Sequence, residues 1–270
     1  MTDENVARDR AAMPPGTHRV LDRRRLGRDH RRLAERLVPG LAVLDVGCGT
    51  GAITRGIAEA VAPGGRVVGV DVSEALITAA WREHGTVPGL IFELHDVYQL
   101  PFRDAFDVVT AARVLQWLAR PADAIAAMAR AACPGGRVLV LDFNHDKLAL
   151  EPAPPAAARA FLAAFLRWRA EAGMDNAMAD HLAGLFARAG LCEVAVSPQH
   201  EVARRGEPDF EARAGIWADV AATRGRQMVA DGVVDEHGRA AAEAELRAWA
   251  HGDGETMRMY LLAVEGVRAL

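Results

Sequence analysis

The stretch VLDVGCGTG (residues 43–51) decides the fold, because an apolar run enters three glycines and a helical pattern follows at once. Residues 42–46 have the character of a buried strand, and residues 52–62 repeat apolar positions at helical spacing. Glycines let the backbone approach a ligand and adopt positive φ. The helix start after them offers unpaired N–H groups to a negative group. The segment predicts a ligand-binding loop at the carboxyl end of a central strand.

The same alternation of short strands and helices continues beyond this segment. The predicted strands are continuous apolar runs, which is typical of strands buried on both faces of a parallel sheet. They predict an α/β fold with a Rossmann-like, doubly wound, mostly parallel seven-stranded sheet. Strands are expected at 42–46, 66–70, 90–94, 106–110, 137–142, 191–197 and 260–264, and helices at 52–62, 74–83, 121–132, 155–172, 179–189, 208–231 and 236–250.

The ends of the chain and its second half depart from this rhythm. Residues 1–16 are polar and show no apolar period, so we expect a mobile N-terminal tail there. A helix is predicted from His18 to Val38, where leucines recur among arginines. We expect one domain over residues 17–270, with a core at 40–145. Helical lid insertions are expected after strands five and six, at about 146–178 and 200–255.

Composition excludes several classes of protein. The chain has 270 residues, of which 51% are hydrophobic and 25% charged, and its formal net charge is −4. This composition excludes a disordered chain and disfavours a basic protein that coats nucleic acid. No stretch reaches the length of a membrane span, and the first residues lack the apolar core of a signal peptide, so a cytoplasmic protein is expected. Three scattered cysteines, at 48, 133 and 192, form neither a disulfide framework nor a zinc site, and no metal is expected.

Three carboxylates follow at the ends of successive predicted strands. Asp45 lies two residues before Gly47, Asp71 ends the second strand, and Asp96 follows the third. A carboxylate beside the glycine loop would repel a pyrophosphate and attract an ammonium group. An acid at the end of the second strand commonly accepts hydrogen bonds from ribose hydroxyls, and Asp96 can accept one from the exocyclic amine of adenine. Together the acids favour a nucleoside with a cationic tail.

These segments, in this order, resemble class I S-adenosylmethionine-dependent methyltransferases of the small-molecule type, including the ubiquinone/menaquinone-biosynthesis enzymes. The resemblance covers residues 40–145. It implies S-adenosyl-L-methionine as cofactor and S-adenosyl-L-homocysteine as product. It rests on VLDVGCGTG (43–51), GVDVS (69–73), HDVYQLPF (95–102), FDVVTAARVLQWL (106–118) and PGGRVLVLDF (134–143).

The resemblance also implies roles for single residues. The equivalents of loop 47–51 cradle the methionine moiety, and those of Asp71 and Asp96 hold ribose and adenine. Apolar neighbours of these acids flank the adenine ring, and two residues after the fourth strand line the wall beside the sulfonium. The implied cofactor-binding residues are Asp45, Gly47, Cys48, Gly49, Gly51, Asp71, Val72, Asp96, Val97, Arg113 and Val114.

One difference from related methyltransferases limits the class of methyl acceptor that we expect. Thr110-Ala111-Ala112-Arg113 stands where methyltransferases acting on nucleic-acid bases or protein glutamine have Asn-Pro-Pro-Tyr. The sequence also lacks the cysteine pair of RNA cytosine C5 enzymes. We therefore expect a small-molecule acceptor and no nucleic-acid partner.

The expected chemistry needs few catalytic groups. A sulfonium methyl is already activated, so the protein must mainly align the reacting atoms. A general base is needed only for a hydroxyl or an acidic carbon. His145, just past the fifth strand, is the first candidate, and His18 and His181 are alternatives. His18 or Arg23 can reach the methionine carboxylate.

Aromatic residues predict an apolar roof over the acceptor. Phe165 and Trp168 lie on one stripe of a predicted helix, and Trp217 lies in the second insertion. With Trp117 and Phe143 they are the expected substrate-binding residues. The same stripes are also typical of an ordinary core. An apolar roof would imply an apolar or aromatic acceptor.

The sequence thus predicts methyl transfer from S-adenosylmethionine to an O, N or C atom of a small metabolite by in-line displacement. The enzyme is expected to be a monomer or homodimer. One alternative is an NAD(P)-dependent oxidoreductase, because Gly47, Gly49 and Ala52 satisfy the G-x-G-x-x-A fingerprint. A second alternative is a non-catalytic S-adenosyl-binding regulatory protein.

Overall fold

The computed structural model describes residues 3–14 and 21–270. Within these ranges the centre of the molecule is one sheet of eight strands, ordered β3-β2-β1-β4-β5-β8-β6, with β7 paired to β8. The strands are β1 (Ala42–Val46), β2 (Arg66–Asp71), β3 (Leu90–Leu94), β4 (Phe106–Ala112), β5 (Ala132–Glu151), β6 (Leu191–Pro198), β7 (Glu201–Arg204) and β8 (Thr256–Arg268).

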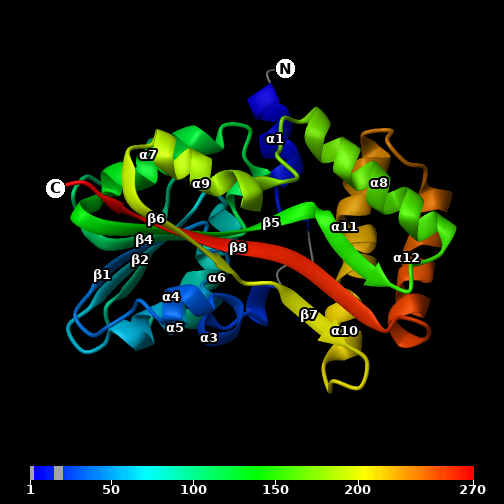
Figure 1. Ribbon diagram of the computed structural model, residues 1–270, viewed down its shortest axis with the longest axis horizontal. Coiled ribbons are helices and arrows are strands. Elements are labelled where there is room, and N and C mark those ends of the chain that lie inside the picture. The colour runs from blue at the N-terminus through cyan, green and yellow to red at the C-terminus, as the bar shows by residue number, and fades with distance from the viewer. Residues whose placement is uncertain (1–2, 15–20) are drawn as a thin grey trace.

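Helices cover both faces of this sheet (Figure 1). Within the described residues, none of them combines the length and apolarity that crossing a bilayer requires. The helices are α1 (Asp3–Ala11), α3 (Leu26–Asp29), α4 (Arg31–Ala34), α5 (Ala52–Val61), α6 (Glu74–His84), α7 (Pro121–Ala131), α8 (Ala156–Glu171), α9 (Met178–Arg188), α10 (Phe210–Ala214), α11 (Ile216–Ala230) and α12 (Glu236–His251), with 3-10 turns η1 (Val97–Gln99) and η2 (Leu115–Trp117).

The α/β prediction is confirmed. Strands β1 to β5 pair in parallel, and β8 runs antiparallel to β5, β6 and β7. Neighbouring residues of β1 point into different cores: Val43 packs with α5, whereas Leu44 packs with α7 and α9. The continuous apolar runs therefore reflect strands that are buried on both faces.

The strand count is eight rather than the predicted seven. The additional strand, β7, has four residues and pairs with the first part of β8. A strand this short carries no apolar run that sequence reasoning could detect. Because β7 intervenes, the second insertion follows β7 and not the sixth strand.

Strands β5 and β8 are also longer than predicted. They were expected at 137–142 and 260–264 but cover 20 and 13 residues. Their pairing shifts register between Asn144 and Ala149 and then continues to Glu151 opposite Thr256. Beyond the central sheet the two strands form a ribbon that reaches α8, α11 and α12 (Figure 1). Side chains there are partly polar and half-buried, so the apolar runs marked only the central part of each strand.

The N-terminal predictions need correction. The mobile tail expected at residues 1–16 is wrong for residues 3–11, which form α1 with Ala7 buried against Ala172 and Met174. The helix predicted from His18 to Val38 is broken into α3 and α4, and its first part, including His18, lies outside the described residues. His30 causes the break, since its buried ring contacts Thr110 Oγ1 at 3.1 Å and its backbone leaves the helical region.

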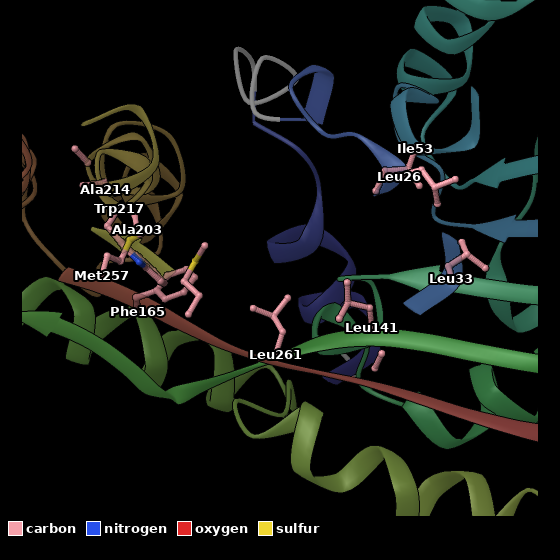
Figure 2. Packing of buried hydrophobic residues seen from close by; sticks show 14 of the residues in the cluster. Leu26, Leu33, Ile53, Leu141, Phe165, Ala203, Ala214, Trp217, Met257 and Leu261 are labelled. Atoms are coloured by element: carbon pink, nitrogen blue, oxygen red, sulfur yellow. The ribbon is translucent and has the colours of Figure 1, made fainter. Parts of the chain in front are cut away.

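The helix predicted at 208–231 is likewise divided. Gly215 separates α10 from α11, and α11 packs against α8 and α12 at the far end of the ribbon. In Figure 2, Phe165 of α8 and Trp217 of α11 lie in one cluster with Met257 of β8. The insertions therefore build a helical layer with its own apolar contacts, continuous with the core of the sheet.

A buried carboxylate ties the N-terminal segment to the sheet. Glu265 of β8 is only 2% exposed and accepts hydrogen bonds from Arg36 at 2.6 and 2.9 Å and from Arg32. Arg137 lies 3.3 Å away. Burial alone would raise the pKa of Glu265, but the hydrogen bonds from Arg36 and Arg32 and the Arg137 charge lower it to about 2. The interaction therefore depends on an ionised Glu265.

We expect Glu265→Gln to lower the free energy of unfolding by about 1–3 kcal/mol at pH 7, because three arginines lose their shared anion. Since the pKa of Glu265 in the folded protein lies below the ordinary glutamate value of 4.5, the difference from wild type should be full above pH 4.5 and shrink as the pH falls towards 2. Urea unfolding at several pH values measures it. Glu35→Gln, which removes an exposed partner of Arg32, is the matched control and should change little. Equal stability of wild type and Glu265→Gln at pH 7 would contradict the role of this cluster.

Candidate active site

The carboxyl ends of β1, β2 and β4 border a cavity of about 500 Å³. Parallel pairing aligns these ends, because Asp45 lies opposite Gly69 of β2 and Thr110 of β4. The loops after the strands form one side of the cavity, and α1 and α11 contribute to the other. This is the edge of an open α/β sheet at which ligands bind.

The glycine loop is shaped by close contacts as well as by positive φ. Gly47 and Gly49 line the cavity with φ values of 71° and 57°. A Cβ on Gly47 would overlap the side chain of Val114. Gly51 is not part of the wall. A Cβ there would lie 2.7 Å from the ring of Phe92, so Gly51 is required for packing rather than for contact with a ligand.

Asp45 is a buried carboxylate on the cavity wall. It is 4% exposed and accepts a 2.7 Å hydrogen bond from Thr54 Oγ1. Burial, with a smaller contribution from the charge of Asp71, raises its pKa to about 7. Within the described residues no cation pairs with it. A ligand cation at this wall would therefore favour the ionised form.

Asp71 supports the loop that it faces. Its Oδ2 accepts a hydrogen bond from Gly49 N and its Oδ1 one from Ser73 N, each at 3.0 Å. Each carboxylate oxygen has a second lone pair, so Asp71 can still accept bonds from ligand hydroxyls. Burial raises its pKa above the ordinary value, although the backbone donors oppose this shift.

Asp96 lies at the same wall, after β3. Its Oδ1 accepts a hydrogen bond from Tyr98 N at 2.9 Å, and its Oδ2 lies 3.5 Å from Arg8 of α1. The flanking valines both line the cavity but differ in accessibility: Val72 is 61% exposed, whereas Val97 is buried. Three acids from successive strand ends thus line one cavity, as the sequence predicted.

Arg113 occupies the wall after β4 in an unusual conformation. Its φ is 62°, which strains a side chain other than glycine. The guanidinium is 4% exposed, pairs with Glu201 and donates to the Asp29 carbonyl at 3.1 Å. Its Cζ lies 5.6 Å from the centre of the Phe143 ring. Arg113 therefore lines both this cavity and a second one of about 290 Å³.

Comparisons with known proteins support this reading of the geometry. Residues 44–140 match the family model described as "Methyltransferase domain". Residues 44–140 form a class I S-adenosylmethionine-dependent methyltransferase domain. The matched segment runs from β1 into β5 and contains the loop and the three acids.

Relatives share this domain rather than the whole chain. A ubiquinone/menaquinone biosynthesis C-methyltransferase from Bordetella avium is 36% identical over 144 residues, covering 52% of this chain and 54% of the relative. An uncharacterized 37.1 kDa protein in a Streptomyces fradiae transposon is 39% identical over 114 residues, covering 42% of this chain and 33% of that protein. The chain thus spans a third to about half of these relatives.

Solved structures share the fold at low identity. The [4+2]-cyclase SpnF aligns with a TM-score of 0.55 and 22% identity over 89% of this chain and 79% of that chain. A Haemonchus contortus phosphoethanolamine N-methyltransferase aligns with a TM-score of 0.55 and 15% identity over 100% of this chain and 58% of that chain. These likenesses concern the fold alone.

The residues that line the cavity fit S-adenosylmethionine, the cofactor of this class of methyltransferase. Asp45 offers a carboxylate to an ammonium group, and Asp71 retains free acceptor capacity for hydroxyls. Thr50 Oγ1, at the cavity wall, is buried without a hydrogen-bond partner in the described residues. The glycine loop removes the side chains that would otherwise occupy the space. All the sequence-predicted cofactor residues line the cavity except Gly51.

Helix α1 closes the cavity from the side that sequence analysis left empty. Ala7, Arg8 and Ala11 line it. Arg224 of α11 holds the end of α1, because its guanidinium donates to the carbonyls of Arg10, Ala11 and the following Ala12 at 2.6–3.1 Å. The only helical signal in the tail is small residues spaced four apart, which is too weak to predict a cavity wall.

His145 does not reach the cavity wall of the methyltransferase domain. Its Nε2 contacts Gln116 Oε1, its ring stacks on Phe143, and Phe165 and Trp217 meet it edge-on. Burial, and then the charge of Arg169, lower its pKa well below the ordinary value. The structure therefore places the expected base in an aromatic cluster.

The alternative His181 is also distant from the chemistry. It is exposed, and its Nδ1 lies 2.6 Å from Asp175 Oδ2. It does not line the cavity. Among the residues that the structure describes, the histidine that lines the cavity is His95, whose Nε2 lies 2.9 Å from Glu93.

Of the aromatic residues that were expected to bind the methyl acceptor, some line a cavity and others are buried in the hydrophobic core. Trp117 lines the main cavity, and Phe143 lines the second cavity. Phe165, Trp168 and Trp217 are at most 5% exposed and pack in the core (Figure 2 shows Phe165 and Trp217). The aromatic stripe is therefore core packing and not a roof over the acceptor.

We expect the affinity for S-adenosylhomocysteine to fall as the pH drops below about 7, approaching tenfold per pH unit. In the free protein Asp45 then becomes protonated, and binding an ammonium group requires the proton to leave. Calorimetry between pH 5.5 and 8.5 measures this dependence. In Asp45→Asn the affinity should be about 10–100-fold lower at pH 8 and independent of pH in this range. An unchanged pH profile in that variant would exclude Asp45 as the ammonium partner.

We also expect Arg224→Gln to release α1. Three backbone carbonyls lose their donor, so trypsin should cleave after Arg8 or Arg10 several times faster, and S-adenosylhomocysteine should dissociate faster. Limited proteolysis and stopped-flow fluorescence measure the two effects. Arg226→Gln, on the exposed side of the same helix, is the matched control. Equal cleavage rates of the two variants would show that Arg224 does not hold α1 in place.

Proposed function

We propose that the protein is an enzyme that transfers a methyl group from S-adenosylmethionine to an O, N or C atom of a small molecule. The observation that carries the proposal is the cavity in which the glycine loop meets Asp45, Asp71 and Asp96 from three strand ends. Carboxylates beside the glycine loop attract the cationic tail of a nucleoside such as S-adenosylmethionine. They repel the pyrophosphate of a dinucleotide.

The relatives support this proposal in part. The Bordetella avium protein is named as a C-methyltransferase of ubiquinone and menaquinone biosynthesis. SpnF, named as a [4+2]-cyclase, has a similar fold. The fold is therefore compatible with more than one activity, and methyl transfer itself must be measured.

The residues have distinct roles in the proposed reaction. When bound, S-adenosylmethionine supplies an electrophilic methyl group whose departure leaves a neutral thioether. Asp45 holds the ammonium group, Asp71 the ribose hydroxyls and Asp96 the adenine amine. Val72 and Val97 flank the base. These contacts fix the position of the methyl carbon, and alignment of the reacting atoms can contribute roughly 7–11 kcal/mol.

Exclusion of water completes the site. Helix α1 covers the cavity, and Trp117 with Leu118 gives it an apolar wall against which an apolar or aromatic part of the acceptor can pack. The proposal assigns no base role to His145, since its position and lowered pKa oppose proton uptake. A cytoplasmic monomer or homodimer, as the sequence predicts, remains part of the proposal.

The test is a transfer assay with methyl-labelled S-adenosylmethionine and a small-molecule extract. Wild type should label a small molecule. Gly49→Val should not, because a branched side chain at φ 57° distorts the loop and fills the cavity. Asp71→Ala should weaken cofactor affinity by ~1–3 kcal/mol. Glu74→Ala, exposed on the neighbouring helix, is the control and should behave as wild type.

Two outcomes would replace the proposal. Tight NAD binding without binding of S-adenosylmethionine would support an oxidoreductase. Binding of S-adenosylmethionine with no transfer to any extract would support a regulatory protein. Calorimetry with NAD and with S-adenosylmethionine separates these cases.

A further inference from the structure

The second cavity, of about 290 Å³, has an excess of positive charge. Six arginines line it against three carboxylates, and Phe143, His200 and apolar side chains complete the wall. The arginines are Arg23, Arg24, Arg28, Arg31, Arg113 and Arg213, and the carboxylates are Asp29, Glu201 and Asp219. The chain as a whole carries a net charge of −4, so this concentration of positive charge is local.

Two of these arginines belong to both cavities. Arg24 and Arg113 line the main cavity as well as the second one. The cavities therefore meet at this pair of guanidinium groups. A molecule in the second cavity lies next to the space assigned to the cofactor.

The guanidinium of Arg113 is only partly satisfied by the protein. Its Nη2 donates to Asp29 O and to Glu201, whereas its Nη1 is buried without a partner in the described residues. A buried donor without a partner is costly. The contacts with Asp29 O and Glu201 hold this side chain in place, although its φ of 62° is strained.

Arg24 has even fewer partners. Its side chain makes no hydrogen bond or ion pair within the described part of the chain. Burial, and then the nearby charge of Arg113, lower its pKa to about 10, so it stays charged at neutral pH. Two neighbouring guanidinium groups, one of them with a buried donor that no described protein group satisfies, favour an anion between or beside them.

We propose that the methyl acceptor carries a carboxylate or phosphate group, which the second cavity holds against Arg24 and Arg113 while the rest of the acceptor reaches the main cavity. This inference rests on the proposed function. The methionine carboxylate of the cofactor can engage Arg24, but Arg23, Arg28, Arg31 and Arg213 line only the second cavity. The anionic group is held and not methylated, so the product keeps its charge.

The size of the cavity and its aromatic wall limit the acceptor further. A space of about 290 Å³ suits a small acid rather than a polymer. Phe143 lies beneath Arg113 and offers an apolar surface beside the charge. The acceptor class is therefore a small organic acid or phosphate ester with an apolar part.

The first experiment titrates the full chain, saturated with S-adenosylhomocysteine, with inorganic phosphate and with benzoate, followed by ³¹P and ¹H NMR. Wild type should bind at least one probe, and the tighter probe identifies the anion type. Arg24→Gln should weaken that binding about tenfold or more, and the exposed Arg31→Gln about threefold. Arg25→Gln, in the same segment but lining neither cavity, is the matched control and should not weaken it.

The second experiment passes the labelled product of the transfer assay over an anion-exchange resin. Retention of the label supports an anionic acceptor, and label in the neutral fraction overturns it. No probe binding, or equal weakening by Arg24→Gln and Arg25→Gln, also overturns the inference. If Arg24→Gln lowers only the affinity for S-adenosylhomocysteine, the arginine serves the cofactor and the inference fails.

The readouts separate this inference from the proposed function. Binding of S-adenosylhomocysteine and methyl transfer test the enzyme, whereas the probe titration and the charge of the product test the acceptor. An active enzyme with a neutral product would contradict only the inference that the acceptor is anionic. A chain without methyl-transfer activity would contradict the proposed function, on which the inference rests.

Discussion

The parallel pairing of β1 with β2 and β4 is the constraint on which the rest of the structure depends. It brings the carboxyl ends of these strands to one edge, where the backbone must leave the sheet. At β1 it does so through Gly47, which is pressed so closely against Val114 that no side chain fits. Asp71 then fastens the loop through Gly49 N. The cavity exists because strand order, loop packing and this carboxylate act together.

The acids of the cavity wall have dual roles. Asp71 accepts hydrogen bonds from Gly49 N of the loop after β1 and from Ser73 N of its own loop, Asp96 accepts one from Tyr98 N, and both acids still face the cavity. Burial raises the pKa of Asp45, although the hydrogen bond from the Thr54 hydroxyl opposes this shift, and no cation of the described residues pairs with it. A site built this way is partly organised before a ligand arrives, which reduces the cost of ordering it on binding. The remaining electrostatic imbalance favours a cationic ligand.

The insertions determine what lies beside that site. The ribbon of β5 and β8 carries α8, α11 and α12 away from the main sheet, and their aromatic side chains fill the core between them. Arg224 of α11 reaches back to hold α1 over the cavity. The α3–α4 segment brings its arginines to β7 and Arg113, where the second cavity forms. Thus segments outside the regular alternation of strands and helices enclose the site.

By itself, the sequence determined the parallel sheet, the glycine loop and the three acids, because each depends on local signals: apolar runs, glycines at a strand end and the residue that follows each strand. The sequence predicted a mobile tail in place of α1, continuous helices where α3 and α4 or α10 and α11 are separate, and site roles for Phe165 and His145. Only the tertiary structure decided those points, since they depend on contacts between residues far apart in the chain. The pairing of Arg224 with the end of α1 and the meeting of Arg24 with Arg113 leave no periodic trace in the sequence, because long-range packing fixes them.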